Sequence, residues 1–348
     1  MKQFQTGVVV GKFYPPHRGH KYLIDTAIAQ SERAVVLVTD TPNLEISAET
    51  RAEWLREIHP KTEVRVIPDI CMDNDSIAWA KHTIDFLGYV PEAAFTSENY
   101  GIAWSEAMGC AHVCVDQARR TFPVSGTKVR SNPMANWEYL EPPVRAHYAK
   151  RVCLLGAEST GTSTLAKDLA DHYNTAWVPE YGRFYSDGKY TAQGSKWRTD
   201  EFVHIAEQQA RTEDWLVRSA NRVLICDTDP FATSIWHERY IGEPSPEVVA
   251  IADSRHYDLY ILTGDEIPFV QDGLRDGEHI RHQMTRRFEQ ALNESGRGFI
   301  KVIGTRNMRI REAVKAIDSI IWQEKRQLST RTLRSRPTRL SLQFAAAY

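Results

Sequence analysis

The opening stretch at residues 7–20, GVVVGKFYPPHRGH, constrains the fold of this chain more than any other part of the sequence. The run VVV at 8–10 is apolar and β-branched, which is typical of a fully buried strand in a parallel sheet. Gly11 permits a sharp turn after this strand, and an amphipathic helix is predicted to begin near His17. A strand end, a glycine turn and a helix N-terminus direct backbone N–H groups and a positive dipole end at one point. The stretch therefore predicts an anion-binding site.

Two histidines, His17 and His20, are three residues apart, so both can face that point from the first helical turn. A metal-binding pair and two solvated histidines are the alternative interpretations, although no cysteine or carboxylate lies nearby to complete a metal site. The segment GKFYPPHRGH resembles the phosphate-binding signature G-x-F-x-P-x-H-x-G-H of the nucleotidylyltransferase superfamily. The resemblance implies that both histidines hold a triphosphate and stabilise charge on the phosphorus under attack. It also implies that Gly11, Lys12 and Phe13 belong to the phosphate site.

A second stretch, FPVSGTKVR at 122–130, contains another predicted helix start. Ser125, Gly126 and Thr127 stand at this start, and Arg130 follows one turn later. Capping side chains, freed amides and an arginine can hold phosphate; a capped surface helix with a solvated arginine is the alternative. The stretch resembles the second superfamily signature, S-x-T-x-x-R. This resemblance implies that it binds the ATP phosphates from the other side.

Short apolar runs alternate with helical patterns through the first half of the chain. Strands are expected at 34–39, 63–67, 94–96 and 112–115, and helices at 46–58 and 75–87. This alternation predicts a parallel, doubly wound sheet whose ligands lie at the carboxyl ends of the strands.

The length of 348 residues predicts about two domains. A net charge of −2 gives no reason to expect nucleic-acid binding through bulk electrostatics. We found no signal peptide and no apolar run of about 20 residues, so we expect a cytoplasmic protein without a membrane span. Reduced, buried thiols are favoured over disulfides because the cysteines are scattered and odd in number. They are Cys71, Cys110, Cys114, Cys153 and Cys226.

A second glycine-containing loop follows a predicted hinge at 141–145, EPPVR. A strand expected at 152–155 and a helix expected at 165–173 flank this loop, GAESTGTST at 156–164. A strand, a glycine loop and a helix in this order are typical of a P-loop, whose successive amides form an anion nest. The predicted nucleotide-binding residues of the loop are Gly156, Glu158, Ser159, Thr160, Gly161, Thr162, Ser163 and Thr164.

Thr162 departs from the P-loop pattern G-x-x-x-x-G-K-[ST], which has lysine at this position. Loss of a preorganised charge at the transferring phosphoryl group typically costs on the order of 3–4 kcal/mol of transition-state stabilisation unless the charge is replaced. Lys167, Arg183 and Arg275 are candidates to replace it. The departure therefore bears on kinase activity, while the loop amides and Ser163 can still bind nucleotide.

Two further strands are predicted in the second half, at 175–178 and 222–227. The second ends in Asp227, where a P-loop fold places its Mg²⁺-associated aspartate. Asp229 suits a different role, because it directly precedes Pro230 and can cap the helix that begins there.

Two charged segments complete the pattern. PEYGR at 179–183 presents an acid, an aromatic ring and a base together. DGLR at 272–275 follows a strand expected at 258–263, precedes a charged helix expected at 278–295, and looks like a mobile lid that supplies Arg275 to phosphate. Taken singly, each segment is more typical of a surface turn than of a site.

Together, PEYGR, CDTD and DGLR resemble the ribosylnicotinamide kinase half of the NadR-type bifunctional proteins. In that family a nicotinamide-nucleotide adenylyltransferase domain precedes the kinase domain. The resemblance implies an α/β chain with two doubly wound parallel-sheet domains, a Rossmann-like nucleotidylyltransferase followed by a P-loop kinase fold. We expect these domains at 1–145 and 150–325, followed by a disordered basic tail at 326–348.

The resemblance also implies the chemistry. The N-terminal domain would transfer the adenylyl group of ATP to nicotinamide mononucleotide, which gives NAD and pyrophosphate. The C-terminal domain would use ATP to phosphorylate nicotinamide riboside, with Mg²⁺ held by Ser163 and Asp227. Glu180 would either accept the hydroxyl proton or hold the ribose, while Tyr181 and Arg183 would bind the substrate.

A tryptophan is expected to stack on the nicotinamide ring of the adenylyltransferase substrate, since a cationic ring suits an aromatic face. Trp79 and Trp104 are the candidates, and Trp79 is favoured. Some members of the family begin with a helix-turn-helix segment that this sequence lacks, so we expect no DNA binding and no transcriptional repression. We also expect a homo-oligomer.

Two rival functions stay open at this point. The first domain could be another enzyme of the superfamily, such as a pantetheine-phosphate adenylyltransferase fused to a kinase. Alternatively, Thr162 could have silenced the second domain, which would then sense ATP or NAD without transferring a phosphoryl group.

Overall fold

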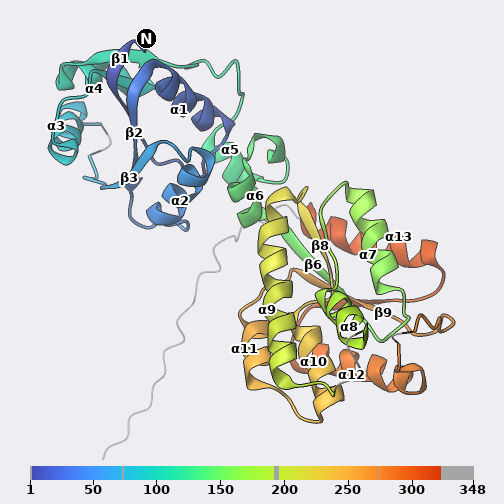
Figure 1. Cartoon of the computed structure of the whole chain (residues 1–348). Coiled ribbons are helices and arrows are strands. Elements are labelled where there is room, and N and C mark those ends of the chain that lie inside the picture. The colour runs from blue at the N-terminus through green and yellow to red at the C-terminus, as the bar shows by residue number, and fades with distance from the viewer. Residues whose placement is uncertain (1, 73, 192–195, 274, 323–348) are drawn as a thin grey trace, which may run out of the picture.

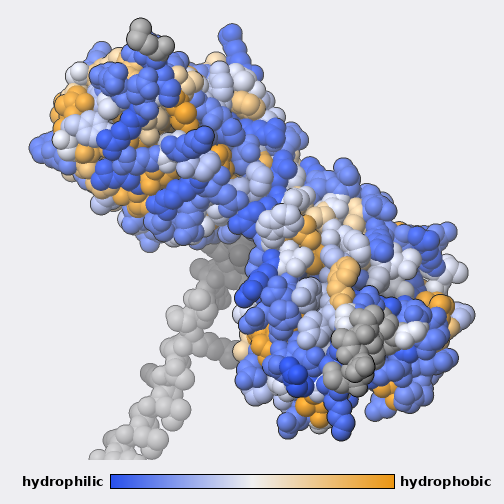
Figure 2. Space-filling view, in the orientation of Figure 1, coloured by the Kyte–Doolittle hydropathy of each residue, from blue (hydrophilic) through white to orange (hydrophobic). Residues whose placement is uncertain are grey.

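The computed structural model describes residues 2–72, 74–191, 196–273 and 275–322. The predicted basic tail at 326–348 and Leu274 of the predicted lid lie outside these residues. Two five-stranded sheets, each flanked by helices, occupy the two lobes of the molecule (Figure 1). Figure 2 shows a largely hydrophilic surface on both lobes, interrupted by small hydrophobic patches. Within the described residues, none of the helices has the length and apolar character needed to cross a membrane.

The first sheet is parallel and has the strand order β3-β2-β1-β4-β5. Its strands are β1 (Phe4–Gly11), β2 (Ser31–Asp40), β3 (Glu63–Pro68), β4 (Ala93–Thr96) and β5 (Ala111–Cys114). The helices of this half are α1 (Arg18–Gln30), α2 (Ala48–Ile58), α3 (Ser76–Leu87), α4 (Tyr100–Met108) and α5 (Gly126–Ser131). Each predicted strand and helix is confirmed to within a few residues. The sheet is buried on both faces, as the β-branched runs predicted.

The helix α4 was not predicted from the sequence. Its segment, YGIAWSEAM, contains a glycine and has only a weak apolar stripe, so the helical period is hard to recognise. Gly101 is required there because a Cβ atom would lie 2.0 Å from Thr96 Oγ1. The predicted helix at 46–58 begins two residues later than expected, because Ser47 is its N-cap and accepts a hydrogen bond from Thr50 N.

The second sheet is also parallel, with the order β10-β9-β6-β8-β7. Its strands are β6 (Lys150–Leu155), β7 (Trp177–Val178), β8 (Val223–Asp227), β9 (Leu259–Thr263) and β10 (Phe299–Val302). The α-helices are α7 (Thr162–Tyr173), α8 (Tyr181–Thr191), α9 (Thr199–Leu216), α10 (Pro230–Ile241), α11 (Pro246–Asp253), α12 (Arg281–Glu294) and α13 (Arg306–Ile321). The 3₁₀ turns of the chain are η1 (Trp137–Tyr139), η2 (Val217–Ser219) and η3 (Glu278–Ile280). The predicted helix at 278–295 is thus a 3₁₀ turn followed by α12.

The predicted hinge at 141–145 was wrong, because these residues begin a helix, α6 (Pro142–Tyr148). Proline is tolerated in the first turn of a helix, where its missing N–H has no partner to lose, so two prolines here start a helix rather than a flexible joint. Val144 of this helix is fully buried. It belongs to one apolar cluster that joins Trp137 and Leu140 to residues of the second sheet such as Val152. The connection between the two halves is therefore packed.

The cysteines are all free, as the sequence predicted, although their burial differs. Cys153 and Cys226 are buried in the second sheet, while Cys71 and Cys114 are exposed and Cys110 is partly buried. Burial raises the pKa of the Cys153 and Cys226 thiols, so both stay protonated.

Both sheets have a point where the chain order reverses, which in open α/β sheets creates a crevice at the carboxyl ends of the strands. In the first sheet β1 lies between β2 and β4, and in the second β6 lies between β8 and β9. The two glycine loops predicted to bind phosphate follow β1 and β6. The topology therefore places both at the crevices.

Candidate active sites

The first crevice contains a cavity of about 730 Å³. It brings together all the residues that the sequence predicted for the first site. These are Gly11, Lys12, Phe13, His17, His20, Trp79, Ser125, Gly126, Thr127 and Arg130.

His17 and His20 lie at the start of α1 with their rings stacked, the centroids 3.7 Å apart. His17 is the N-cap, and its Nδ1 accepts a hydrogen bond from His20 N at 3.3 Å. Because Nδ1 accepts, a neutral His17 carries its proton on Nε2 and can donate from there. In the described part of the chain, His20 Nδ1 is buried without a hydrogen-bond partner. A phosphate oxygen could supply the partner that this atom lacks.

Burial and a nearby arginine keep both histidines neutral in the ligand-free site. Burial, with help from Arg119, lowers the pKa of His17 to about 4. Burial also holds the pKa of His20 well below its ordinary value, with His17 and Arg119 adding to the effect. An anion in the cavity would oppose this shift, because it favours the charged imidazole.

Arg119 lines this cavity and was missed by the sequence analysis. It follows a loop organised by Asp116, whose carboxylate accepts hydrogen bonds from the backbone N–H groups of residues 120–122. Glu98 lies 3.4 Å from the Arg119 guanidinium. No local pattern in the sequence marks Arg119, because it reaches the site from a loop between a strand and the next helix.

The helix α5 closes the opposite side of the cavity. Ser125 caps it by accepting a hydrogen bond from Lys128 N at 3.2 Å, as predicted. Gly126 lies against the first glycine loop, where a Cβ atom would come 2.6 Å from the carbonyl oxygen of Tyr14. Arg130 donates to the same carbonyl and to Thr127 Oγ1, and its guanidinium lies over the Tyr14 ring. Two segments far apart in the sequence are thus joined around one cavity.

A buried arginine fixes the first glycine loop from behind. Arg51 of α2 is fully buried and donates hydrogen bonds to the carbonyl oxygens of Lys12, Thr39 and Ile46. The sequence analysis missed Arg51, because an arginine in an amphipathic helix is ordinarily a surface residue.

Aromatic side chains also line this cavity. Trp79 and Trp104 both line it, so the structure brings together the two tryptophan candidates. Trp104 is buried, and in the described residues its Nε1 has no hydrogen-bond partner. Tyr100 lies beside Trp104 and donates from its hydroxyl to Val10 O at 3.2 Å.

The metal interpretation of the histidine pair has no support in the described residues, where we found no cluster of three or more histidine, cysteine, aspartate or glutamate side chains. The pair is instead surrounded by aromatic and cationic groups. Phe13 packs edge-on against the His20 ring, with the centroids 5.1 Å apart.

The second crevice contains a cavity of about 350 Å³ at the carboxyl ends of β6 and β8. Most of the predicted residues line it: Gly156, Glu158, Ser159, Thr162, Ser163, Glu180, Arg183, Asp227 and Arg275. Thr160, Gly161, Thr164 and Tyr181 were also predicted but are not among its lining residues.

The P-loop has the tight backbone that a phosphate-binding loop needs. A Cβ atom on Gly156 would lie 2.3 Å from Thr263 Oγ1, so only glycine fits. Ser159 and Gly161 have left-handed φ angles of 59° and 84°. Thr160 is buried beneath the loop and donates to Ala157 O at 2.7 Å.

Two arginines that the sequence analysis missed hold this loop. Arg309 of α13 donates to Thr160 O at 2.6 Å and to Gly264 O at 3.0 Å. Arg281 of α12 donates to Ser159 O at 2.8 Å. Both come from helices more than a hundred residues away in the sequence, so no local motif could connect them to the loop.

Two carboxylates that interact electrostatically, Glu180 and Asp227, line the second cavity. Burial raises the pKa of Asp227 to about 6, although a hydrogen bond from Ser163 and the charge of Lys167 oppose the shift. Burial, together with the charge of Asp227, raises the pKa of Glu180 to about 8. Both shifts favour the protonated carboxyl, and the pKa of Glu180 is raised further than that of Asp227.

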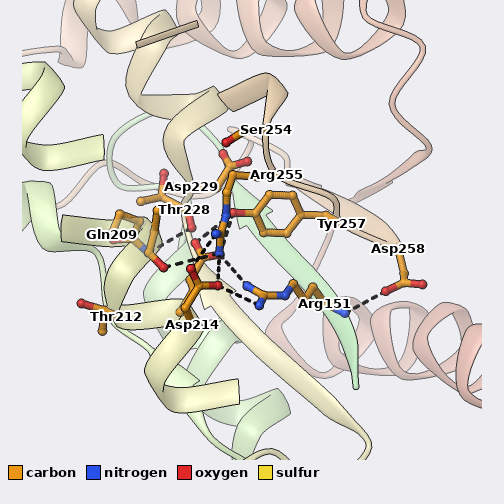
Figure 3. Close-up of polar contacts among 12 residues, drawn as sticks. Arg151, Gln209, Thr212, Asp214, Thr228, Asp229, Ser254, Arg255, Tyr257 and Asp258 are labelled. Atoms are coloured by element: carbon orange, nitrogen blue, oxygen red, sulfur yellow. Dashed lines mark hydrogen bonds and ion pairs between the residues drawn. The ribbon is translucent and has the colours of Figure 1, made fainter. Parts of the chain in front are cut away.

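A glutamine of α9 connects the elements that carry these carboxylates. Gln209 accepts a hydrogen bond from Tyr181 N at 2.9 Å, directly after Glu180, and donates to Thr228 O at 3.3 Å, directly after Asp227. Figure 3 shows Gln209 beside Thr228 and Asp229.

An ion-pair network continues from Gln209 along the same helix (Figure 3). Glu213 is fully buried, accepts from the Tyr257 hydroxyl at 2.8 Å and lies 3.3 Å from Arg151 and Arg255. Arg255 also pairs with Asp214 at 2.7 Å. The network therefore ties α9 to the start of β6 and to the segment before β9.

An aromatic wall lines the other side of the second cavity and was not predicted. Trp197, Phe202, Trp236 and Tyr240 all contribute to it. The Trp197 and Tyr240 ring centroids are 5.5 Å apart. These residues come from α9, α10 and the segment before α9, so the sequence shows no single aromatic motif.

The segment after β9 closes over the P-loop through polar contacts. Glu158 accepts a hydrogen bond from Gly277 N at 2.8 Å and pairs with Arg239 at 3.2 Å. Ser159 Oγ accepts from Val270 N at 2.8 Å. The P-loop side chains therefore hold this segment as well as lining the cavity.

Comparisons with known proteins agree with this geometry. Residues 8–132 match the family described as Cytidylyltransferase-like, and residues 151–309 match the family described as AAA domain. Two solved structures share the fold. One, described as NadR protein in complex with NR, has a TM-score of 0.73 at 20% identity and covers 90% of this chain and 95% of its own. The other, described as NadR protein in complex with NAD and AMP-PNP, has a TM-score of 0.70 at 19% identity and covers 98% of this chain and 99% of its own.

Two relatives extend the similarity to the sequence. The trifunctional NAD biosynthesis/regulator protein NadR of Escherichia coli strain K12 is 31% identical over 323 residues, covering 85% of this chain and 78% of the relative. The protein of the same name from Salmonella typhimurium strain LT2 is 32% identical over 299 residues, covering 79% of this chain and 72% of the relative. With both glycine loops at the expected crevices and this level of identity along most of its length, the chain belongs to the NadR family.

Proposed function

We propose that this chain makes NAD in two ATP-dependent steps, one in each cavity. The second cavity phosphorylates nicotinamide riboside, and the first transfers the adenylyl group of ATP to the resulting nicotinamide mononucleotide. The observation that carries the proposal is the pairing of a stacked His17–His20 cap with the N-terminus of α5 around one cavity. This arrangement suits a polyphosphate held between two helix N-termini.

In the first cavity the reaction needs position and electrostatic stabilisation rather than a covalent intermediate. The 5′-phosphate of nicotinamide mononucleotide attacks the α-phosphorus of ATP, and pyrophosphate leaves. His17 and His20 hold the phosphates from α1, while Thr127 and Arg130 hold them from α5, with Lys12 at the loop between β1 and α1. The aromatic side chains of Trp79 and Trp104 suit the cationic nicotinamide ring.

In the second cavity the 5′-hydroxyl of the riboside attacks the terminal phosphorus of ATP, the bond from that phosphorus to the bridging oxygen breaks, and ADP leaves. Glu180 either accepts the hydroxyl proton or holds the ribose; its raised pKa places it in the range of an effective base near neutral pH. The aromatic wall of Trp197, Trp236 and Tyr240 suits the cationic pyridinium ring.

The residues at the P-loop fit Mg²⁺. Ser163 and Asp227 offer adjacent oxygen donors joined by a hydrogen bond, and a buried carboxylate with a raised pKa gains from a nearby cation. When bound, Mg²⁺ would neutralise charge on the ATP phosphates. Ser163 and Asp227 would hold it there.

We further propose the domain limits 1–145 and 150–325, with α6 and its buried contacts forming the join. A cytoplasmic location is consistent with the free cysteines. The homo-oligomer and the lack of DNA binding stay predictions, which sedimentation and a DNA-binding titration would test.

The deciding experiment is product chromatography after incubation with Mg·ATP and nicotinamide riboside alone. Formation of NAD requires both activities. A Ser163→Ala variant should lose the kinase step while it still makes NAD from the mononucleotide. If neither the riboside nor the mononucleotide gives NAD, the substrate assignment is wrong.

A second candidate function rests on Thr162. If the P-loop without its lysine binds nucleotide but transfers no phosphoryl group, the second domain is a nucleotide sensor. The chain would then make NAD from the mononucleotide and none from the riboside. Membership in the NadR family disfavours the alternative that the first domain is a pantetheine-phosphate adenylyltransferase. An assay in which pantetheine phosphate competes with nicotinamide mononucleotide would test this alternative directly.

A further inference from the structure

The P-loop of this chain has no charge at the position where the sequence pattern has lysine. Thr162 is the first residue of α7 and lines the second cavity. Phosphoryl transfer depends almost entirely on positioning and on electrostatic stabilisation of the transferred group. An active kinase therefore needs a cation from another element in this cavity.

Two arginines near the loop, Arg309 and Arg281, already donate hydrogen bonds to oxygen atoms of the protein. Arg309 uses its guanidinium on the carbonyls of Thr160 and Gly264 and on Glu266. Arg281 donates to Ser159 O and to Ile267 O. Each of these arginines binds a carbonyl group of the loop.

Lys167 is also poorly placed. Its Nζ lies 4.8 Å from the centroid of the Trp177 ring, and the residue is not among those that line the cavity. It acts on Asp227 through its charge, from the turn of α7 beyond Ser163.

Two cationic residues, Arg183 and Arg275, are found among the described residues that line the cavity. Arg275 folds back on its own segment, where it donates to Val270 O and lies 3.2 Å from Asp272. Arg183 instead projects from the first turn of α8, and this turn is anchored by the hydrogen bond from Tyr181 N to Gln209. A cation on an anchored helix is better preorganised than one on a loop.

Two carboxylates lie close to Arg183. Its guanidinium lies 2.8 Å from Asp272 and 3.8 Å from Asp187 of the same helix, and Asp272 also pairs with Arg275. Because Asp272 is divided between two guanidinium groups, its ion pair with Arg183 is not exclusive.

We propose that Arg183 replaces the missing P-loop lysine as the cation that binds the transferred phosphoryl group of ATP. The inference rests on the proposed kinase function and assigns a role that the P-loop pattern gives to another residue. An arginine is suited to this role, because its planar fork can bind two phosphate oxygens at once.

The test uses the full chain and measures formation of nicotinamide mononucleotide from the riboside. Arg183→Ala should lower kcat by about 100-fold to 1,000-fold, the usual effect of removing a group that stabilises transition-state charge. Arg183→Lys should retain at least ten times more activity than Arg183→Ala. Arg211→Ala, at an exposed arginine of α9, is the matched control and should keep the wild-type rate.

Rescue separates this role from a merely structural one. Adding Thr162→Lys to Arg183→Ala should restore at least tenfold in kcat, because it returns a cation to the loop. Three outcomes would overturn the proposal. They are wild-type kinase activity in Arg183→Ala, a loss in Arg183→Lys as large as that in Arg183→Ala, and no gain in kcat when Thr162→Lys is added to Arg183→Ala. Adenylyl transfer to nicotinamide mononucleotide takes place in the first cavity and should be unchanged throughout, and an unchanged melting temperature should show that each variant is folded.

Failure of the proposed function gives a different result. The wild-type chain itself would then form no nicotinamide mononucleotide from the riboside, and the inference would fall with it. If the wild type forms nicotinamide mononucleotide from the riboside and Arg183→Ala forms it at the same rate, the role of Arg183 is wrong while the proposed kinase function stands.

Discussion

Gln209 holds together the two carboxylates of the kinase cavity, and its replacement by leucine tests this arrangement. The side chain is 1% exposed and makes two backbone hydrogen bonds, one to the residue after Glu180 and one to the residue after Asp227. Gln209→Leu keeps the approximate volume and removes both. The Tyr181 N–H and the Thr228 carbonyl would then be left without these partners.

The size of the effect follows from those two groups. Leaving one buried donor or acceptor unsatisfied costs about 1–3 kcal/mol, so two cost about 2–6 kcal/mol if the backbone does not move. Movement of the start of α8 recovers part of this cost, but it displaces Glu180. We therefore expect a drop of at least about 1.4 kcal/mol in transition-state stabilisation, which is tenfold in kcat/KM for the riboside.

The assay compares both activities of the same protein. Kinase kcat/KM should fall at least tenfold in Gln209→Leu, while adenylyl transfer in the first cavity should stay at the wild-type rate. Gln208→Leu makes the same chemical change one residue earlier, at a side chain that does not line the cavity. If Gln209→Leu and Gln208→Leu have the same kinase rate and the same melting temperature, the positioning role of Gln209 is refuted.

Three other predictions concern single sites. His20→Ala should reduce adenylyl transfer by about 100-fold to 1,000-fold and leave the melting temperature nearly unchanged, since this residue stabilises phosphate charge. Kinase kcat/KM should rise with pH through about 8 if Glu180 is the base, because its ionised form accepts the proton. Glu180→Gln should abolish kinase activity and with it this dependence on pH. A wild-type kcat/KM that does not change with pH would show that Glu180 binds the ribose and is not the base. Gly126→Ala should impair adenylyl transfer but not the kinase, because the added methyl would lie 2.6 Å from the Tyr14 carbonyl; an unaltered rate would show that the two segments can separate.

The parts of this molecule that sequence predicts well are those fixed by local physics. The buried run at 8–10 and the helix start near His17 each follow from the conformational preferences of a few neighbouring residues. The turn after the strand lies at Phe13, whose φ is 44°, and not at Gly11, which ends β1. Ser125 and Asp229 were likewise identified as caps, and both accept the hydrogen bond expected of a cap. Because parallel strands end at one edge, the sequence also predicted which loops would meet.

The predictions failed where the outcome depended on context. The segment at 141–145 was interpreted as a hinge because prolines often interrupt structure, yet two prolines at a helix start are also favourable. The weak periodicity of α4 concealed a helix that is held in place by the packing of Trp104 and Met108. In both cases tertiary packing selected between local conformations that the sequence alone left close in energy.

Three of the residues that the sequence analysis missed, Arg51, Arg281 and Arg309, share one function, which is to bind the carbonyl groups of the phosphate loops. Arg51 binds the carbonyl of Lys12 in the first loop, and Arg309 binds the carbonyl of Thr160 in the second. In a trans peptide unit the C=O and the next N–H point in opposite directions, so a carbonyl held by a buried arginine turns the following N–H away from that arginine. Two unrelated loops on separate sheets thus use the same device to fix their peptide orientation before a nucleotide arrives. Preorganised donors of this kind need no rearrangement during the reaction, and this is the property that electrostatic catalysis of phosphate chemistry requires.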